Sequence, residues 1–315
     1  MDMRPLGRTG LKIAPVVFGG NVFGWTADEK TSFDLLDGFV DAGFNGIDTA
    51  DSYSRFVEGN KGGESETIIG NWLAANPGKR DRIVLMTKVG SDMGHGKTLS
   101  KKWILEEVEA SLKRLRTDAI DLYQSHWPDD ATPYEETLSA YDELIKAGKV
   151  RKIGASNFSA GQLRAALDVS EAKGLPRYDT LQPEYNLYDR SGFEGPLRDL
   201  AIEEDLGVIT YFSLASGFLS GKYRSKADLS KSKRGSRVEK YLDERGMAIL
   251  SALDTVSKAH DAKPAEVALA WVIAAKGVTA PIASATSRSQ LDSLVKAASL
   301  KLSPSDIESL NAAGA

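Results

Sequence analysis

The chain has no cysteine, few histidines and no long apolar run, and each of these absences excludes a class of protein. Without cysteine it can form neither disulfide bonds nor thiolate metal sites, which fits a reducing compartment. Three histidines among 315 residues leave little material for a zinc centre. No run of about 18 apolar residues occurs, and the N-terminal MDMRPLGRTG lacks the apolar core of a signal peptide. We therefore expect a cytoplasmic protein that does not enter a membrane.

Charges of both signs are mixed along the chain. The 40 basic and 44 acidic side chains give a net charge of −4, and no basic tail or stripe stands out, so we do not expect nucleic acid as a partner. The hydrophobic fraction of 42% is enough for a large core. The length suits one α/β barrel, and no linker divides residues 1–315, so we expect a single domain. No exposed apolar stripe is distinct enough to indicate an oligomeric state.

Short apolar segments alternate with helical patterns. The segments are rich in β-branched and aromatic residues, as buried parallel strands are, and they lie at 15–20, 44–48, 83–87, 120–124, 150–155, 179–182, 207–212 and 279–283. Helical periodicity fills the intervals at 30–43, 100–115, 133–149 and 159–174. Eight strands separated mostly by one helix each predict a (β/α)8 TIM barrel.

Three segments lie outside this repeating pattern. Gly7, Gly10 and alternating apolar residues near the N-terminus predict a short hairpin that closes the barrel bottom. A Gly-, Ser- and Lys-rich stretch at 216–237 is expected to be either a functional loop or a disordered one, and beyond residue 225 we expect a solvated loop. Extra helices are predicted towards the C-terminus, with patterns at 239–260 and 264–276.

Ionisable side chains stand at the ends of three consecutive predicted strands. Asp48 ends the second strand and Tyr53 follows it closely, Lys88 comes directly after the third, and His126 comes just after the fourth. Taken singly, each has an ordinary explanation as a helix cap or a core residue. Because catalytic residues of a TIM barrel lie at the carboxyl ends of its strands, the four side chains together predict a proton-transfer site.

Physical chemistry assigns a role to each of these groups. A free tyrosine has a pKa of about 10 and is a poor proton donor at neutral pH. The ammonium of Lys88 should lower the pKa of Tyr53, while Asp48 holds Lys88 in place and charged. His126 can hydrogen-bond a carbonyl oxygen placed over Tyr53. The set has no activated serine or cysteine, so it suits protonation of an alkoxide with a cofactor as the other reactant.

The stretch GSDMGHGKT at 90–98 raises a different possibility, because a phosphate-binding P-loop also ends in Gly-Lys-Thr. The spacing does not match, since the motif G-x-x-x-x-G-K has fewer intervening residues than the five that separate Gly90 from Gly96. The stretch is therefore interpreted as a loop that follows Lys88, with Lys97 as a loop charge. A metal-dependent barrel hydrolase is a further alternative, which the histidine count disfavours.

Six blocks of the sequence resemble the aldo-keto reductases. They occur in the order and spacing of that family from about residue 3 to residue 310 and read GFNGIDTADSY, VLMTKVG, SLKRLRTDAIDLYQSHWPD, VRKIGASNFS, LQPEYNLYDR and GFLSGKY. The most similar type is the bacterial one whose fourth strand reads DLYQ-x-HWPD. The resemblance implies Asp48, Tyr53, Lys88 and His126 as a catalytic tetrad that reduces an aldehyde or ketone, with Tyr53 as the proton donor.

The resemblance also implies NADPH or NADP⁺, bound without a Rossmann domain, and no G-x-G-x-x-G follows a strand in this chain. Ser156, Asn157 and Gln182 match positions that hydrogen-bond the carboxamide, and Tyr211 matches the aromatic residue that stacks on the nicotinamide. The pyrophosphate loop is matched by Phe212, Ser213, Leu214, Gly217, Gly221 and Lys222, although the family commonly has Tyr-Ser-Pro-Leu where this chain has YFSL. The remaining cofactor positions at this end are Gly20, Asn21 and Asp48.

The block IASATSRSQLDSL matches the adenosine end of the family's cofactor site, with departures. Ser284 stands in place of a glycine, and Thr286 in place of the common arginine. A 2′-phosphate needs a cation and hydrogen-bond donors, which Arg288, Ser287 and a helix N-terminus could supply. NADPH is therefore expected rather than NADH, with Gln290 as an adenine contact.

Aromatic residues near the tetrad predict the substrate pocket. Phe23, Trp25 and Trp127, together with Tyr53 and His126, suit an apolar or ring-bearing small-molecule carbonyl compound. The alternative is a regulatory or sensor subunit that binds NADPH and turns over slowly, as some proteins of this fold family do for channels. The absence of an additional N-terminal segment leads us to expect the enzyme.

Overall fold

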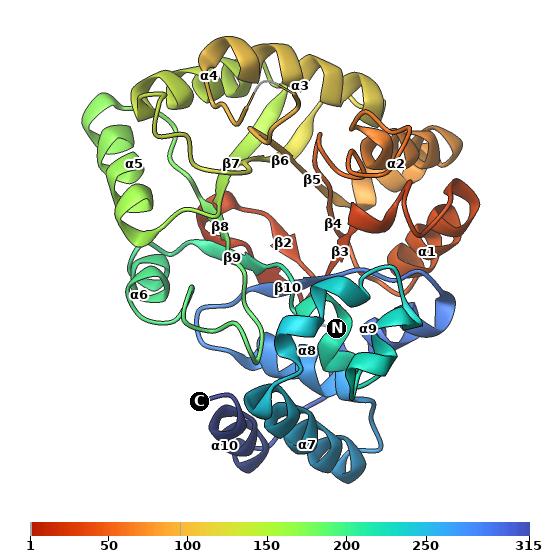
Figure 1. Ribbon diagram of the computed structural model, residues 1–315. Coiled ribbons are helices and arrows are strands. Elements are labelled where there is room, and N and C mark those ends of the chain that lie inside the picture. The colour runs from red at the N-terminus through yellow and green to blue at the C-terminus, as the bar shows by residue number, and fades with distance from the viewer. Residues whose placement is uncertain (1, 95) are drawn as a thin grey trace.

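In the computed structural model, which describes residues 2–94 and 96–315, eight parallel strands close into a barrel (Figure 1). Around the barrel they follow the order β10-β3-β4-β5-β6-β7-β8-β9. Their bounds are β3 Val17–Gly19, β4 Gly46–Asp48, β5 Val84–Val89, β6 Ile120–Ser125, β7 Val150–Ser156, β8 Thr180–Gln182, β9 Gly207–Thr210 and β10 Ala280–Ala283. The predicted (β/α)8 barrel is confirmed.

Helices form a ring outside the strands (Figure 1). They are α1 Glu29–Asp41, α2 Glu64–Ala75, α3 Lys101–Leu115, α4 Tyr134–Lys146, α5 Ala160–Lys173, α6 Pro196–Glu203, α8 Pro264–Ala274 and α9 Arg288–Ser299. Two more helices, α7 Glu244–Ala259 and α10 Pro304–Ala313, pack against each other beside α8. None of the described helices is both long and apolar enough to cross a membrane.

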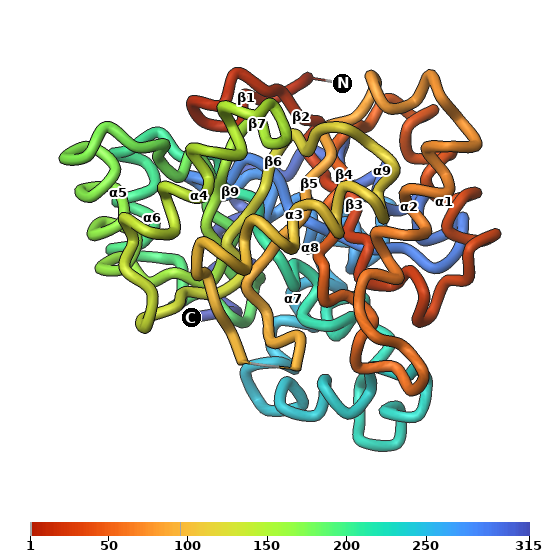
Figure 2. The backbone as a smooth tube through the Cα atoms, turned by 90° about the horizontal axis from the view of Figure 1, so that it is seen from above, coloured from red at the N-terminus to blue at the C-terminus, as the bar shows by residue number. Residues whose placement is uncertain are grey.

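The N-terminal hairpin and the long loop occupy opposite ends of the barrel (Figure 2). β1 Arg4–Pro5 pairs antiparallel with β2 Lys12–Ile13, as the glycines of this region predict. At the other end, the segment 215–241 forms four short 3-10 helices. The helix predicted at 239–260 starts later, since α7 begins at Glu244. Asp243 caps this helix by accepting the backbone N–H of Gly246 at 2.7 Å.

Two apolar layers make up the core. The strand period of two sends Val84 and Met86 of β5 into the barrel interior, and Leu85 and Val89 outward against the helices. The same period aims Lys88 inward at the carboxyl end of β5, beyond Met86. The barrel interior is therefore apolar towards the amino ends of the strands and polar at their carboxyl ends.

The packing of α2 on α3 depends on a residue without a side chain. At Gly70, an added Cβ would lie 2.0 Å from the carbonyl oxygen of Arg114 near the end of α3. Gly70→Ala should therefore force the two helices apart and lower the free energy of unfolding by about 1 to 3 kcal/mol. The measurement is urea denaturation followed by circular dichroism.

Gly161→Ala is the matched control for this substitution. Gly161 also lies in a helix, α5, but no atom comes within 4 Å of an added Cβ there. This change should be neutral or slightly stabilising, because alanine favours the helix. Equal effects of the two substitutions would contradict the close approach of α2 and α3.

Candidate active site

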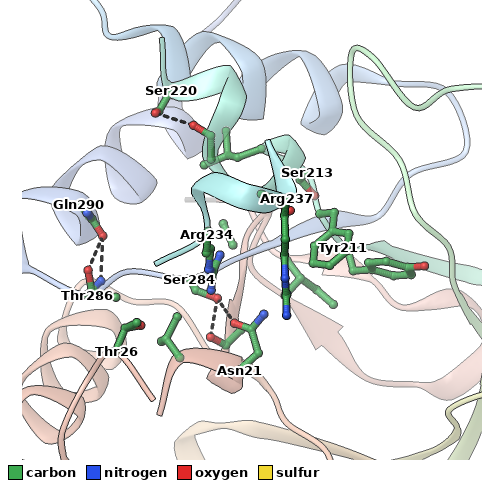
Figure 3. A pocket seen from close by; sticks show the side chains of 18 of the residues that line it. Asn21, Thr26, Tyr211, Ser213, Ser220, Arg234, Arg237, Ser284, Thr286 and Gln290 are labelled. Carbon is green, nitrogen blue, oxygen red and sulfur yellow. Dashed lines mark hydrogen bonds between the residues drawn. The ribbon is translucent and has the colours of Figure 1, made fainter. Parts of the chain in front are cut away.

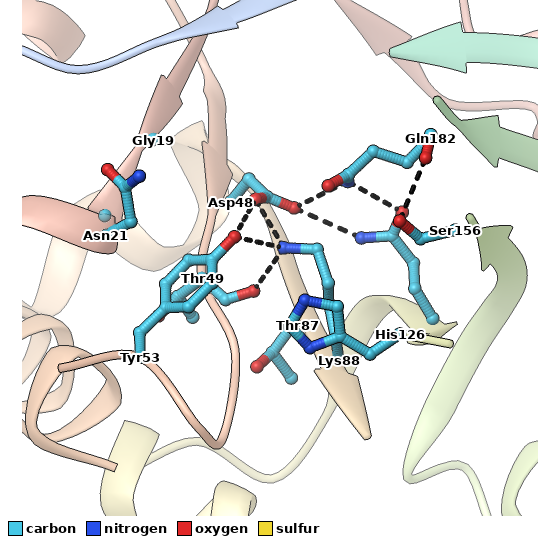
Figure 4. Close-up of polar contacts among 12 residues, drawn as sticks. Gly19, Asn21, Asp48, Thr49, Tyr53, Thr87, Lys88, His126, Ser156 and Gln182 are labelled. Atoms are coloured by element: carbon cyan, nitrogen blue, oxygen red, sulfur yellow. Dashed lines mark hydrogen bonds and ion pairs between the residues drawn. The ribbon is translucent and has the colours of Figure 1, made fainter. Parts of the chain in front are cut away.

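The ammonium of Lys88 is the centre of a buried polar cluster at the carboxyl ends of the strands (Figure 4). Its Nζ donates to Asp48 Oδ2 at 2.6 Å, to the Thr49 carbonyl oxygen at 2.8 Å and to the Tyr53 hydroxyl at 2.8 Å. Lys88 and Asp48 are both fully buried. The structure thus brings the predicted Asp, Tyr and Lys into direct contact, and all three ammonium protons have acceptors.

The second carboxylate oxygen of Asp48 is held by two amides. Gln182 Nε2 lies 3.1 Å and Gln124 Nε2 3.2 Å from Asp48 Oδ1, and Gln182 also donates to Gln124 Oε1 at 3.0 Å. Gln124 was missed in the sequence analysis, although it pairs directly with Lys88 in the register of β5 and β6. Every oxygen of the buried carboxylate therefore has a donor, as a buried ion pair requires.

Burial changes the proton affinities in this cluster. The pKa of Tyr53 is raised well above its usual value by burial and then by the neighbouring Asp48 carboxylate. Burial lowers the pKa of Lys88, against the attraction of Asp48. The expected lowering of the Tyr53 pKa is therefore not found in the resting site, where burial and the Asp48 carboxylate raise it. The phenol keeps its proton at neutral and mildly alkaline pH.

His126 lies beside Tyr53, with ring centroids 6.0 Å apart. Its Nδ1 is 2.9 Å from the Ser91 hydroxyl, and its carbonyl oxygen accepts from Asn157 Nδ2 at 2.8 Å. Burial, and then the charges of Lys88 and Lys97, lower the pKa of His126 well below its usual value. The imidazole is therefore neutral. When Ser91 donates to Nδ1, the proton of the ring is on Nε2 and available to a ligand.

A cavity of about 520 Å³ opens above Tyr53 and His126. Figure 3 shows part of its wall. The structure places most of the predicted cofactor and substrate residues along it, namely Asn21, Trp25, Trp127, Ser156, Asn157, Gln182, Tyr211, Phe212, Ser213, Leu214, Gly217, Lys222, Ser284, Thr286 and Gln290. These residues come from both ends of the sequence and meet only in the folded chain.

Some of these positions are tied to one another. The Tyr211 hydroxyl donates to Asn157 Oδ1 at 2.7 Å, and Asn157 has a left-handed backbone with φ of 65°. Phe212 also has a left-handed backbone, with φ of 50°, so β9 ends at Thr210 and not at 212 as predicted. Ser284, the departure from glycine, has its Oγ 2.7 Å from both the Gly19 carbonyl oxygen and Asn21 Oδ1, and its one proton is shared between these contacts.

Several predicted residues lie away from the cavity wall. Phe23 is fully buried and stacks on Phe18 at 5.5 Å, so it is a core residue and not part of the substrate pocket. Gly20, Gly221 and Asp48 also lie outside the wall.

Arg288 is another residue that the structure places away from the cavity. It is the first residue of α9, and its Nη1 donates to the Asp34 carbonyl oxygen on α1 at 2.9 Å. An added Cβ at Gly38 would lie 1.9 Å from this nitrogen, so the glycine makes room for the guanidinium.

The wall of the cavity is positively charged. Lys222, Lys233, Arg234, Arg237 and Lys263 line it, and no aspartate or glutamate appears among its described lining residues. Arg234 and Arg237 point into the cavity from the 3-10 segment (Figure 3). Arg234 Nη2 is buried without a hydrogen-bond partner in the described structure. Uncompensated cations of this kind suit an anionic ligand.

A second buried acid layer lies behind the cluster, between the barrel and α2 and α3. Glu66 accepts from Thr87 and from Arg114, each at 2.6 Å, and Glu107 also pairs with Arg114. Asp51 is fully buried, but neither of its carboxylate oxygens has a partner in the described structure. Burial and the charges of Glu66 and Glu107 raise the pKa of Asp51 well above its usual value. The carboxyl therefore holds its proton more tightly in the folded protein than in the unfolded chain.

The raised pKa of Asp51 should make stability depend on pH. Its folded pKa is above its unfolded value of about 3.9, so unfolding releases a proton and the free energy of unfolding falls as pH rises above that value. Asp51→Asn should remove this fall, so the variant gains stability relative to the parent by up to about 1.4 kcal/mol per pH unit from pH 4 upward. Denaturant titrations at several pH values measure the difference. A difference that does not change with pH would contradict the raised pKa of Asp51.

Comparison with known proteins shows similarity over nearly the whole chain. A model of the Aldo/keto reductase family matches residues 15–315. The "Uncharacterized oxidoreductase YrpG" of Bacillus subtilis (strain 168) is 36% identical over 319 residues, which cover 99% of this chain and 95% of that protein. The "Aldo-keto reductase YhdN" of the same organism is 33% identical over 323 residues, or 99% and 93% of the two chains. A "Probable voltage-gated potassium channel subunit beta" of Oryza sativa subsp. japonica is 33% identical over 309 residues, or 94% and 91%.

Proposed function

Because the chain belongs to the aldo/keto reductase family and is an oxidoreductase, we propose that it reduces an aldehyde or ketone reversibly to the alcohol with NADPH. The observation that carries the proposal is that the Lys88 ammonium donates hydrogen bonds to both Asp48 and the Tyr53 hydroxyl beneath a large cavity. This arrangement holds a protonated phenol where its proton can leave and its charge can be stabilised.

In this proposal Tyr53 donates its proton to the oxygen of the substrate carbonyl. The resting phenol is protonated, and Lys88, 2.8 Å away, stabilises the phenolate that forms. Asp48 keeps Lys88 charged inside the protein through its 2.6 Å ion pair. The Nε2–H of His126 orients the carbonyl oxygen towards the Tyr53 hydroxyl. In the oxidation of an alcohol the same groups act in reverse.

The residues of the cavity fit a nicotinamide dinucleotide, which supplies a hydride when bound. Ser156, Asn157 and Gln182 would hold the carboxamide, and the Tyr211 ring would stack on the nicotinamide. The positive wall and the unpartnered Arg234 suit the phosphates. The side of the cavity that α9 lines carries one further cation. Lys263 Nζ donates to Ser293 Oγ of α9 at 3.1 Å, and Ser289 and Gln290 of the same helix also line the cavity. We therefore assign the 2′-phosphate to Lys263 in place of Arg288.

The proton donor is tested by Tyr53→Phe, which removes only the hydroxyl. The value of kcat for 4-nitrobenzaldehyde should fall by at least about 100-fold, because general acid catalysis is lost. The Kd of NADPH should change little, because the substitution removes only one hydroxyl and leaves the rest of the cavity wall intact. Quenching of tryptophan fluorescence measures this Kd, since Trp25 and Trp127 line the cavity. Tyr134→Phe, on α4 and outside the cavity wall, is the matched control with full activity. Full activity of Tyr53→Phe would rule out this residue as the donor.

The cofactor preference is tested by comparing Lys263→Ala with Arg288→Ala. Loss of the cation next to a 2′-phosphate should lower the ratio of kcat/KM for NADPH over NADH by about fivefold in Lys263→Ala. Arg288→Ala should leave the ratio unchanged, because its guanidinium faces α1. Steady-state kinetics with both cofactors measures the ratio. If the ratio fell in Arg288→Ala and not in Lys263→Ala, the 2′-phosphate would be assigned to Arg288.

A regulatory subunit is the second candidate function, and one relative supports it. The rice protein that matches 94% of this chain carries the name of a potassium channel subunit. Such a subunit would bind NADPH and turn over slowly, so the kcat of the purified protein separates the two functions. The complete hydrogen bonding of the Asp48–Lys88–Tyr53 cluster supports the enzyme.

A further inference from the structure

Lys97 has a defined place at the rim of the cavity. Its Nζ lies 3.8 Å from the ring centroid of Trp127, and Trp127 lines the cavity. Trp127 also stacks on His126, with ring centroids 6.1 Å apart and an interplanar angle of 15°. The Trp127 ring therefore connects the Lys97 ammonium to the His126 imidazole, where the carbonyl of a substrate would react. The interpretation of Lys97 as only a loop charge omits this contact.

The charge of Lys97 has no acidic partner within the described residues. The carboxylate nearest in sequence, Asp92, accepts the backbone N–H groups of Gly94 and Gly96 at 2.8 and 2.9 Å. The Asp92 carbonyl oxygen accepts from Arg55 at 2.5 Å, which ties this loop to the segment after Tyr53. The loop is thus held by its own hydrogen bonds, and the ammonium is left facing the aromatic ring.

Another part of the cavity wall repeats this combination of a cation and aromatic rings. Trp25 and Phe56 contact each other edge to face at 5.0 Å. The guanidinium of Arg237 lies 5.8 Å from the Trp25 ring and 5.5 Å from the Phe56 ring. Arg237 also has no ion pair within the described chain. Aromatic surfaces that carry uncompensated cations bind flat molecules with a negative charge better than neutral ones.

Resting on the function proposed above, we propose that the substrate is an anionic carbonyl compound, whose carboxylate or phosphate is bound by Lys97 where its ammonium lies over the Trp127 ring. Its reacting carbonyl and its anionic group are separated by a spacer about the width of one aromatic ring. The spacer lies against Trp127, and the carbonyl oxygen lies at Tyr53 and His126. Lysine suits this role because its ammonium acts as a point charge towards either anion.

Two aldehydes of similar size test the proposal. 4-Carboxybenzaldehyde carries the anion across one ring from the carbonyl, and methyl 4-formylbenzoate is its neutral counterpart. We expect kcat/KM with NADPH to be about fivefold or more higher for the acid, and this preference should fall as salt is added. 4-Formylphenyl phosphate against 4-methoxybenzaldehyde forms a second pair with the same ring as spacer, and the pair with the larger preference identifies the anion as carboxylate or phosphate.

Variants of Lys97 assign the preference to this residue. Lys97→Met should bring the ratio of kcat/KM for the anionic over the neutral aldehyde close to one, whereas Lys97→Arg should retain it. Lys301→Met, at an exposed lysine between α9 and α10, is the matched control and should keep the parent ratio.

The outcomes separate this inference from the proposed function. Reduction of the neutral aldehydes with no preference for either anion, or a preference that survives Lys97→Met, would overturn the role of Lys97 and leave the reductase function standing. Failure to reduce any of the four aldehydes would overturn the reductase function, and the anionic substrate with it.

Discussion

The buried ion pair between Lys88 and Asp48 is the interaction on which the site depends. Both groups are fully buried, so each would be unstable without the other. The pair is compatible with folding only because Gln124, Gln182, Thr49 and Tyr53 complete its hydrogen bonds. These partners come from separate strands and loops, so the barrel must close before the pair is satisfied. The same closure places the Tyr53 hydroxyl against the ammonium.

The charges around this pair are arranged in layers. Behind it, between the strands and α2 and α3, lie Glu66, Glu107 and Asp51, with Arg114 as the nearby cation. Above it lies a cavity whose described wall carries cations and no carboxylate. A dinucleotide and an anionic substrate are both consistent with this distribution, since the wall has charge that the protein itself does not neutralise.

Sequence periodicity was sufficient to predict the barrel, because a strand buried on both faces and a helix with one apolar face leave different patterns. It also predicted that Asp48, Lys88 and His126 would meet, since parallel strands end at one rim. It was less accurate where a single backbone angle or packing contact decides the outcome. Phe212 has a left-handed backbone, so β9 ends at Thr210 and does not continue to 212. Phe23 packs in the core against Phe18 and does not face the cavity. Neither event has a local sequence signal.

The sequence by itself therefore determined the fold, the depth of the ionisable residues in the barrel and the family to which the chain is similar. Tertiary structure alone decided which way individual side chains point and what surrounds them. Arg288 turns to α1 because Gly38 leaves space there. The phenol of Tyr53 stays protonated because burial and the Asp48 carboxylate raise its pKa. Lys97 lies on Trp127 because two loops after different strands meet at the rim. Each of these outcomes depends on contacts between residues far apart in the chain, which no local pattern encodes.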